Sequence, residues 1–212
     1  MKTPAFLEST WVQADWDRFL VLANDPALQQ AKCYYNCGWM RFEMSPVGPA
    51  HAAANSLIAQ IISLYAYTHS IGLVSYINVS LRRPGLQEAQ PDLAYYLSEQ
   101  SPLPDWSNSP IDLRTTAVPA LVVEVSATTL QDDLAAKRQL YGRLGVREYW
   151  VVDTAGKQVL LFAAVGDGGI LQAQEESAVL PGLTSDLLAQ ALRLGTDEGD
   201  TAAIRFILER EG

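Results

Sequence analysis

The sequence predicts an α/β protein with a mixed central β-sheet flanked by helices, and three observations support this class. The run ALVVEVS at 120–126 is short, apolar and rich in β-branched residues, as expected of a buried strand. Hydroxyl and acidic residues open a helix over 130–144, which Gly145 ends. A second apolar run, EYWVVD, falls in 147–153. Two strands joined by a helix predict a parallel pair at the centre of the sheet.

The remaining elements are expected on both sides of this unit, with a hairpin near the N-terminus. We expect one domain over residues 1–212, with its core at about 36–165 and a helical appendage at about 183–212. The other predicted elements are a helical lead-in within 1–30, a hairpin around a turn at 36–38, a helix at 51–67, strands at about 73–82 and from Pro91 to 96, a long loop at 98–116, an antiparallel strand QVLLFAA, a turn at 166–169, and helices at 185–194 and 200–210.

The composition is that of a globular chain with an acidic balance. The 212 residues carry a formal net charge of −9, which counts against tight non-specific binding to nucleic acid. Cys33 and Cys37 are too few for a disulfide framework or a zinc site of their own. No segment has the length of a membrane span, so we expect a cytoplasmic protein without a membrane partner.

Lys137 is the anomaly in the helix, because it shares the apolar stripe of Leu134 and Tyr141. One interpretation is a surface ion pair with Asp133, four residues earlier. The other is a lysine that faces Glu124, a carboxylate inside the preceding apolar strand, where an unpaired charge is costly. The spacing leaves both interpretations open.

Several of these residues occur in an order that resembles a known family. Val-Glu-Val-Ser is followed by Asp133-x-x-x-Lys137-x-x-x-Tyr141 and by Gly-Val-x-Glu-Tyr-Trp-x-x-Asp at 145–153. Met44-Ser45-Pro46, then His51 at a helix start, then Pro91-Asp92 precede them. The ordered set is similar to the Uma-two family, nucleases of the restriction-endonuclease-like, PD-(D/E)xK type.

The resemblance implies a restriction-endonuclease-like fold and a metal-dependent endonuclease. It implies Asp92, Glu124 and Lys137 as catalytic residues, with Mg²⁺ or Mn²⁺ held by Asp92, Glu124 and the carbonyl of Val125. We expect supporting roles for His51, Glu43, Ser126, Asp133 and Tyr141. For Glu43 a solvated strand carboxylate is the competing interpretation, because it alternates with the apolar Phe42 and Met44.

The sequence departs from the parent pattern at two points. Ser126 stands where the Glu-x-Lys motif has lysine, and the resemblance implies that this lysine has moved to the helix as Lys137. The span from Glu124 to Asp133 is also one residue shorter than the commonest family form. Lys137 can reach Glu124 only if the helix at 130–144 packs on the strand at 120–126.

The resemblance implies nucleic acid as the partner, and we expect DNA. The sequence leaves open whether the chain forms a homodimer. Arg41, Arg82, Arg83, Arg138 and Arg143 could form a basic patch that offsets the acidic balance. The alternative function is a catalytically inactive nuclease fold that serves as a binding or assembly module. The net charge favours this alternative, whereas the joint presence of Asp92, Glu124 and Lys137 favours the nuclease.

Overall fold

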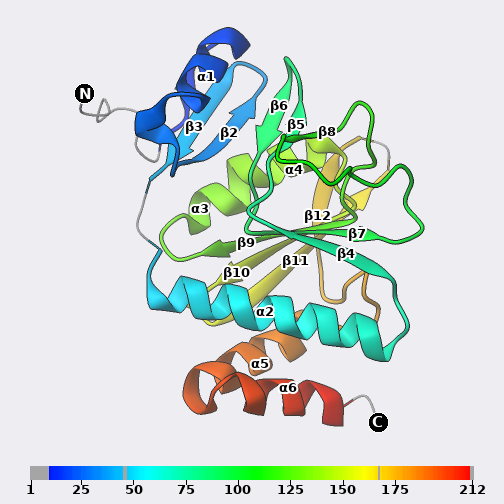
Figure 1. The fold of residues 1–212 in the computed structure, drawn as a ribbon. Helices are drawn as coiled ribbons and strands as arrows, with labels where there is room; N and C mark the ends of the chain where they lie inside the picture. The colour runs from blue at the N-terminus through cyan, green and yellow to red at the C-terminus, as the bar shows by residue number, and fades with distance from the viewer. Residues whose placement is uncertain (1–9, 45–46, 167, 211–212) are drawn as a thin grey trace.

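The computed structural model describes residues 10–44, 47–166 and 168–210 (Figure 1). Its centre is a mixed sheet of six strands, with a parallel pair in the middle. The order is β12 (Ile170–Gln174), β11 (Gln158–Val165), β10 (Glu148–Asp153), β9 (Leu121–Ser126), β7 (Leu93–Leu97) and β4 (Leu73–Ile77). The prediction that 120–126 and 147–153 form the centre of the sheet is confirmed.

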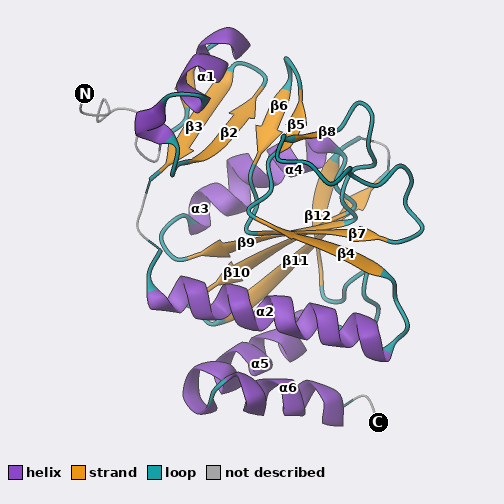
Figure 2. Ribbon diagram, in the orientation of Figure 1, coloured by secondary structure: helices purple, strands orange, loops and turns teal. Residues whose placement is uncertain are grey.

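Helices cover both faces of the central sheet (Figure 2). On one face, α2 (Pro49–Thr68) lies against β9 and α5 (Ser185–Glu198) lies against β11, and α6 (Asp200–Glu209) lies outside them. Leu121, Val123 and Val125 belong to the core that these helices share with the sheet. On the other face lies the connection between β9 and β10. It consists of α3 (Leu130–Asp132), the π-helical segment η3 (Asp133–Lys137) and α4 (Arg138–Leu144), which together match the predicted helix 130–144.

A second six-stranded sheet lies beyond α4 and contains the predicted hairpin. Its order is β1 (Val12–Gln13), β3 (Trp39–Glu43), β2 (Lys32–Asn36), β6 (Gln87–Ala89), β5 (Leu81–Arg83) and β8 (Ile111–Asp112). The predicted hairpin is β2–β3, and β2 pairs further with β6. The helix α1 (Trp16–Ala23) packs on this hairpin through Phe19, whose ring lies against Phe42 of β3. Leu28 of the short 3₁₀ turn η2 (Pro26–Leu28) belongs to the same core.

The predicted strand at 73–82 is wrong in its extent, because the chain changes sheets within it. Leu73–Ile77 forms the edge of the central sheet, whereas Leu81–Arg83 belongs to the second sheet. Between them Asn78 has a φ of 53°, a left-handed conformation that asparagine tolerates better than most residues. The strand expected to open at Pro91 begins at Leu93 instead.

Side-chain alternation along β9 sends its residues into two separate cores. Val123 packs towards α2, whereas Val122 packs with Leu140 and Tyr141 of α4 and with Tyr34 of β2. Glu124 follows the phase of Val122, so its carboxylate points into the layer between the two sheets. Within the described part of the chain, no helix is long and apolar enough to cross a bilayer.

Candidate active site

A cleft of about 1020 Å³ runs along α2, and we call it the α2 cleft. Small and neutral polar residues line part of it, among them Ser56, Gln60 and Ser75. Charged and titratable side chains line the rest: Lys32, Glu43, His51, Asp92, Glu124 and Lys137. The cleft therefore combines a neutral surface with a compact ionic cluster, and that cluster contains the catalytic residues implied by the sequence resemblance.

Asp92 stands directly before β7, at the point where pairing between β7 and β9 stops. Its Oδ2 accepts the backbone N–H of Val125 at 2.7 Å. If β7 continued further, this N–H would pair with β7 instead. Its Oδ1 lies 2.5 Å from Lys32 Nζ and 3.1 Å from His51 Nε2. Burial alone would raise the pKa of Asp92, but the bond from His51 and the charge of Lys32 outweigh it. The pKa of Asp92 therefore lies well below its usual range.

Glu124 is 2% exposed and depends on tyrosine hydroxyls for its hydrogen bonds. Its Oε1 accepts from Tyr141 at 2.6 Å and lies 3.1 Å from the hydroxyl of Tyr34. Burial raises the pKa of Glu124 to about 8, although the charges of Lys137 and Lys32 act in the opposite direction.

Lys137 is 1% exposed, so the interpretation of a surface pair with Asp133 is wrong. The pair exists, with Nζ 2.9 Å from Asp133 Oδ1, but it is buried, and the same ammonium lies 3.7 Å from Glu124 Oε1. Burial alone would lower the pKa of Lys137, but the surrounding carboxylates, Glu124 first, hold it well above its usual range. Lys137 is therefore a permanent cation in the site.

The helix that carries Lys137 is locally widened. Residues 133–137 form a π-helical segment, and the hydroxyl of Tyr149 donates to the carbonyl of Asp133 at 3.0 Å. Thr129 Oγ1 donates to Asp133 Oδ2 at 2.6 Å, which anchors the first turn. Such π segments occur often at functional sites. The short connection between Glu124 and Asp133 thus delivers Lys137 to Glu124.

Glu43 belongs to the site, and its interpretation as a solvated strand carboxylate is wrong. Its side chain is 15% exposed, and its Oε1 lies 3.0 Å from Lys137 Nζ and 2.9 Å from Arg41 Nε. Arg41 also lies 3.5 Å from Asp132 Oδ2. The hairpin β2–β3 thus places the opposite charges of Arg41 and Glu43 against Asp132 and Lys137 of the helical connection.

The other expected supporting residues fall into two groups. His51 and Tyr141 contact Asp92 and Glu124 directly. Ser126 is buried, and its Oγ has no hydrogen-bond partner among the residues that the structure describes.

Ser45 and Pro46 of the motif at 44–46 lie outside the described residues. The carbonyl of Val125 stays a predicted ligand, since the observed bond at this residue uses its N–H.

Lys32 and Tyr34 were missed by reasoning from the sequence, although both lie on the site face of β2. Lys32 Nζ reaches Asp92 Oδ1 at 2.5 Å and Glu124 Oε2 at 3.9 Å, and the ring of Tyr34 lies 4.3 Å from Lys137 Nζ. A signal for Lys32 existed in the hairpin. A turn at 36–38 sets Lys32 opposite Glu43. A site role for Glu43 would therefore have predicted that Lys32 also lies near the site.

The donor set fits a hard divalent cation that completes its shell with water. Asp92 and Glu124 offer carboxylate oxygens, which Mg²⁺ and Mn²⁺ prefer, and both flank the position of one ammonium group, Lys32 Nζ. Over residues 10–44, 47–166 and 168–210, no three His, Cys, Asp or Glu side chains gather as a metal-ligand group. Any remaining ligands would be backbone oxygen or water.

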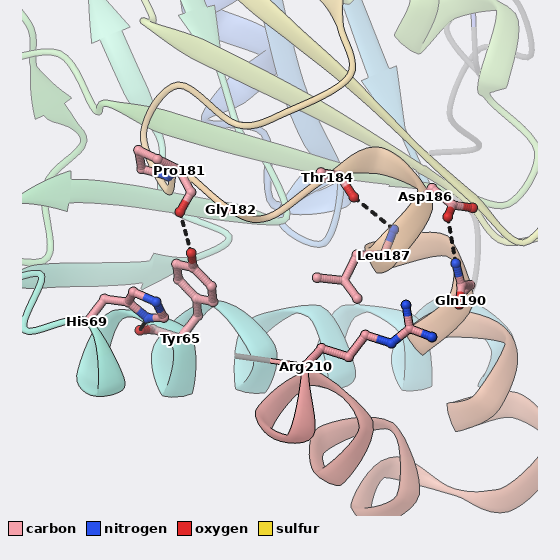
Figure 3. Close-up of a pocket in the computed structure, with 9 residues that line it drawn as sticks. All are labelled: Tyr65, His69, Pro181, Gly182, Thr184, Asp186, Leu187, Gln190 and Arg210. Carbon is pink, nitrogen blue, oxygen red and sulfur yellow. Dashed lines mark hydrogen bonds between the residues drawn. The ribbon is translucent and has the colours of Figure 1, made fainter. Parts of the chain in front are cut away.

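A second hollow, of about 500 Å³, lies near the C-terminal end of α2 (Figure 3). Its polar groups serve the local structure: Tyr65 donates to the carbonyl of Pro181, Thr184 caps α5 at Leu187 N, and Asp186 accepts from Gln190. His69, the C-cap of α2, stacks on Tyr65 with ring centroids 3.9 Å apart. We assign the chemistry to the α2 cleft.

The fold and the cluster of Asp92, Glu124 and Lys137 define a protein of the restriction-endonuclease-like class. The Uma2 family model, described as "Putative restriction endonuclease", matches residues 16–195, and the chain belongs to this family. The resemblance inferred from the motifs is confirmed. No curated protein matches the chain.

The fold matches several solved chains, and one of them shares most of its length with this chain. It is the crystal structure of a protein from Anabaena variabilis ATCC 29413 that is described as "a putative nuclease". The TM-score is 0.56 at 14% sequence identity, over 92% of this chain and 99% of that chain. At this identity the likeness supports the fold alone.

Proposed function

We propose that the chain is a metal-dependent endonuclease that hydrolyses phosphodiester bonds, with DNA as substrate and Mg²⁺ or Mn²⁺ as cofactor. The observation that carries the proposal is the meeting of Asp92, Glu124 and Lys137 in the α2 cleft, from a strand start, a strand interior and a helix. Membership of the Uma2 family supports the same reaction class.

Asp92 and Glu124 would hold the metal, together with the backbone carbonyl of Val125. When bound, the metal would acidify a water molecule and offset negative charge on the phosphate. His51 holds Asp92 through Oδ1, and Tyr141 holds Glu124 through Oε1. These second contacts keep both carboxylates in one orientation while the substrate binds and leaves.

Lys137 supplies the fixed positive charge of the site. Its Nζ is enclosed by Glu43, Asp133 and Glu124, so the ammonium keeps its proton and its position. In the proposed reaction it orients the attacking water or stabilises the negative charge that develops on the phosphate. Because the surrounding carboxylates prevent its deprotonation, we assign it no role as a base.

The cleft favours weak, metal-assisted binding of the substrate. No arginine is among the described residues that line it, and Arg41 and Arg82 of the expected basic patch contact Glu43 and Glu88 instead. With a net charge of −9, phosphate contacts must depend largely on the metal and on the lysines of the site. The same charge is the observation that favours the alternative, an inactive nuclease fold used as a binding or assembly module.

A cleavage assay decides between the two functions. Supercoiled plasmid, single-stranded DNA and RNA are incubated with the protein and Mg²⁺ or Mn²⁺, using wild type, Glu124→Gln, Lys137→Met and Lys157→Met. Lys157 is the matched control, because it pairs with Asp197 at an exposed position. We expect cleavage by wild type and Lys157→Met, and a loss on the order of 10²-fold or more in the site variants. Absence of cleavage by wild type under all conditions would favour the binding module.

A further inference from the structure

Lys32 occupies the position at which the two proposed metal ligands converge. Its ammonium lies 2.5 Å from Asp92 Oδ1 and 3.9 Å from Glu124 Oε2. We propose that Lys32 is a built-in substitute for the metal: it neutralises the two carboxylates in the metal-free protein and is displaced when a divalent ion binds. This inference rests on the proposed function, because it takes Asp92 and Glu124 as the metal ligands.

The hydrogen bonds of Asp92 make the competition direct. Its Oδ2 accepts the N–H of Val125, and this bond belongs to the junction of β7 and β9. The oxygen that faces Lys32 is Oδ1, which also lies 3.1 Å from His51 Nε2, so a metal bound to Oδ1 would take the place of the ammonium. A Mg²⁺ ion binds oxygen at about 2.0–2.1 Å, so an ammonium in hydrogen-bond contact with the same oxygen stands in its way.

The two lysines of the site differ in their freedom to move. The side chain of Lys137 is 2% exposed and is enclosed by carboxylates and by the ring of Tyr34. The side chain of Lys32 is 20% exposed and lines the open cleft. Lys32 can therefore withdraw towards solvent within the cleft, whereas Lys137 has no comparable route. We assign the exchange with the metal to Lys32 alone.

Loss of the positive charge of Lys32 should have opposite effects in the metal-free and in the metal-bound protein. Without metal, removal of the Lys32 ammonium leaves Asp92 and Glu124 facing each other with less compensation. With metal, the same removal takes away a competing cation and its repulsion of the incoming ion. Lys32 should therefore stabilise the metal-free protein and weaken its affinity for divalent ions.

The test is calorimetric titration of the full chain with Mn²⁺, in wild type, Lys32→Met, Lys32→Arg and the matched control Lys157→Met. We expect Lys32→Met to bind Mn²⁺ about tenfold more tightly or better, as for removal of a nearby like charge. Lys32→Arg keeps the charge, and Lys157→Met changes only a distant, half-buried lysine, so both should stay close to wild type. Circular dichroism checks the fold, and Lys32→Gln carries the same test if Lys32→Met does not fold.

Thermal melting provides a second readout that does not depend on cleavage. Without metal, Lys32→Met should melt below wild type, and saturating Mn²⁺ should raise its melting temperature by more than that of wild type. Unchanged or weaker Mn²⁺ binding by Lys32→Met, beside a wild type that binds, would overturn the inference and leave the proposed function standing. Absence of Mn²⁺ binding in wild type and Lys32→Met alike would overturn both.

Discussion

The ammonium nitrogen of Lys137 lies 3.7 Å from Oε1 of Glu124, with both side chains buried between the two sheets. The lysine comes from the helix that follows the strand of Glu124, not from the strand position that Ser126 occupies. The contact makes the helix part of the site. We therefore expect the charges of the site to contribute to the stability of the fold as well as to the proposed chemistry.

Replacement of Lys137 by methionine should destabilise the protein strongly. Methionine matches the length of the lysine stem, but Glu43, Asp133 and Glu124 would lose their shared cation. We expect a loss of about 3 kcal/mol in the free energy of unfolding, as for breaking a buried ion pair. Lys157→Met should change it by no more than about 0.5 kcal/mol, because its ion pair is exposed. Urea unfolding measures both, and equal losses would contradict the buried network.

The hydroxyl of Tyr141 should matter for stability, whereas that of Tyr96 should not. Tyr141 donates a buried hydrogen bond of 2.6 Å to Glu124, but the buried hydroxyl of Tyr96 has no partner among the described residues. Tyr141→Phe should cost about 1.5 kcal/mol, and Tyr96→Phe should be near neutral or stabilising. Thermal and urea unfolding of the two variants form a matched pair. A larger loss for Tyr96→Phe would show that the hydrogen-bond assignment is wrong.

Mn²⁺ should bind wild type and raise its melting temperature, since a ligand that binds only the native state stabilises it. Glu124→Ala should abolish this shift while circular dichroism shows an intact fold, because one of two carboxylate ligands is lost. EDTA should return wild type to its metal-free melting temperature. Retention of the full Mn²⁺ shift in Glu124→Ala would remove Glu124 from the metal site.

The two thiols should differ sharply in reactivity. Burial raises the pKa of Cys33 to about 12, with Glu88 adding to the effect, whereas Cys37 is exposed. A raised thiol pKa means that Cys33 stays protonated at pH 8 and is a poor nucleophile. One thiol should therefore react with Ellman's reagent in the native protein, and the second only after unfolding. Cys37→Ser should show no fast thiol, and a fast reaction in that variant would place Cys33 in contact with solvent.

Much of the central sheet was predictable from the sequence, because its signals are local. The β-branched runs mark β9 and β10, the hydroxyl and glycine signals place the ends of the helix between them, and alternation along β9 places Glu124 on the opposite face from Val123 and Val125. By the same periodicity, the stripe of Leu134, Lys137 and Tyr141 allows the lysine to face Glu124, although it leaves a surface pair with Asp133 open. These features depend on periodicity within one element.

The second sheet and its contribution to the site were decided by tertiary structure. Lys32 and Tyr34 reach the carboxylates only because the hairpin pairs with β6 and covers the layer above β9. Periodicity along β2 indicates which side chains share a face, but not which distant element that face will meet. Which element the face of β2 meets depends on contacts between segments far apart in the chain. The residue pattern within one strand does not predict the energies of these contacts. The sequence by itself determined Asp92, Glu124 and Lys137 as candidates, and the packing of the hairpin decided which charges surround them.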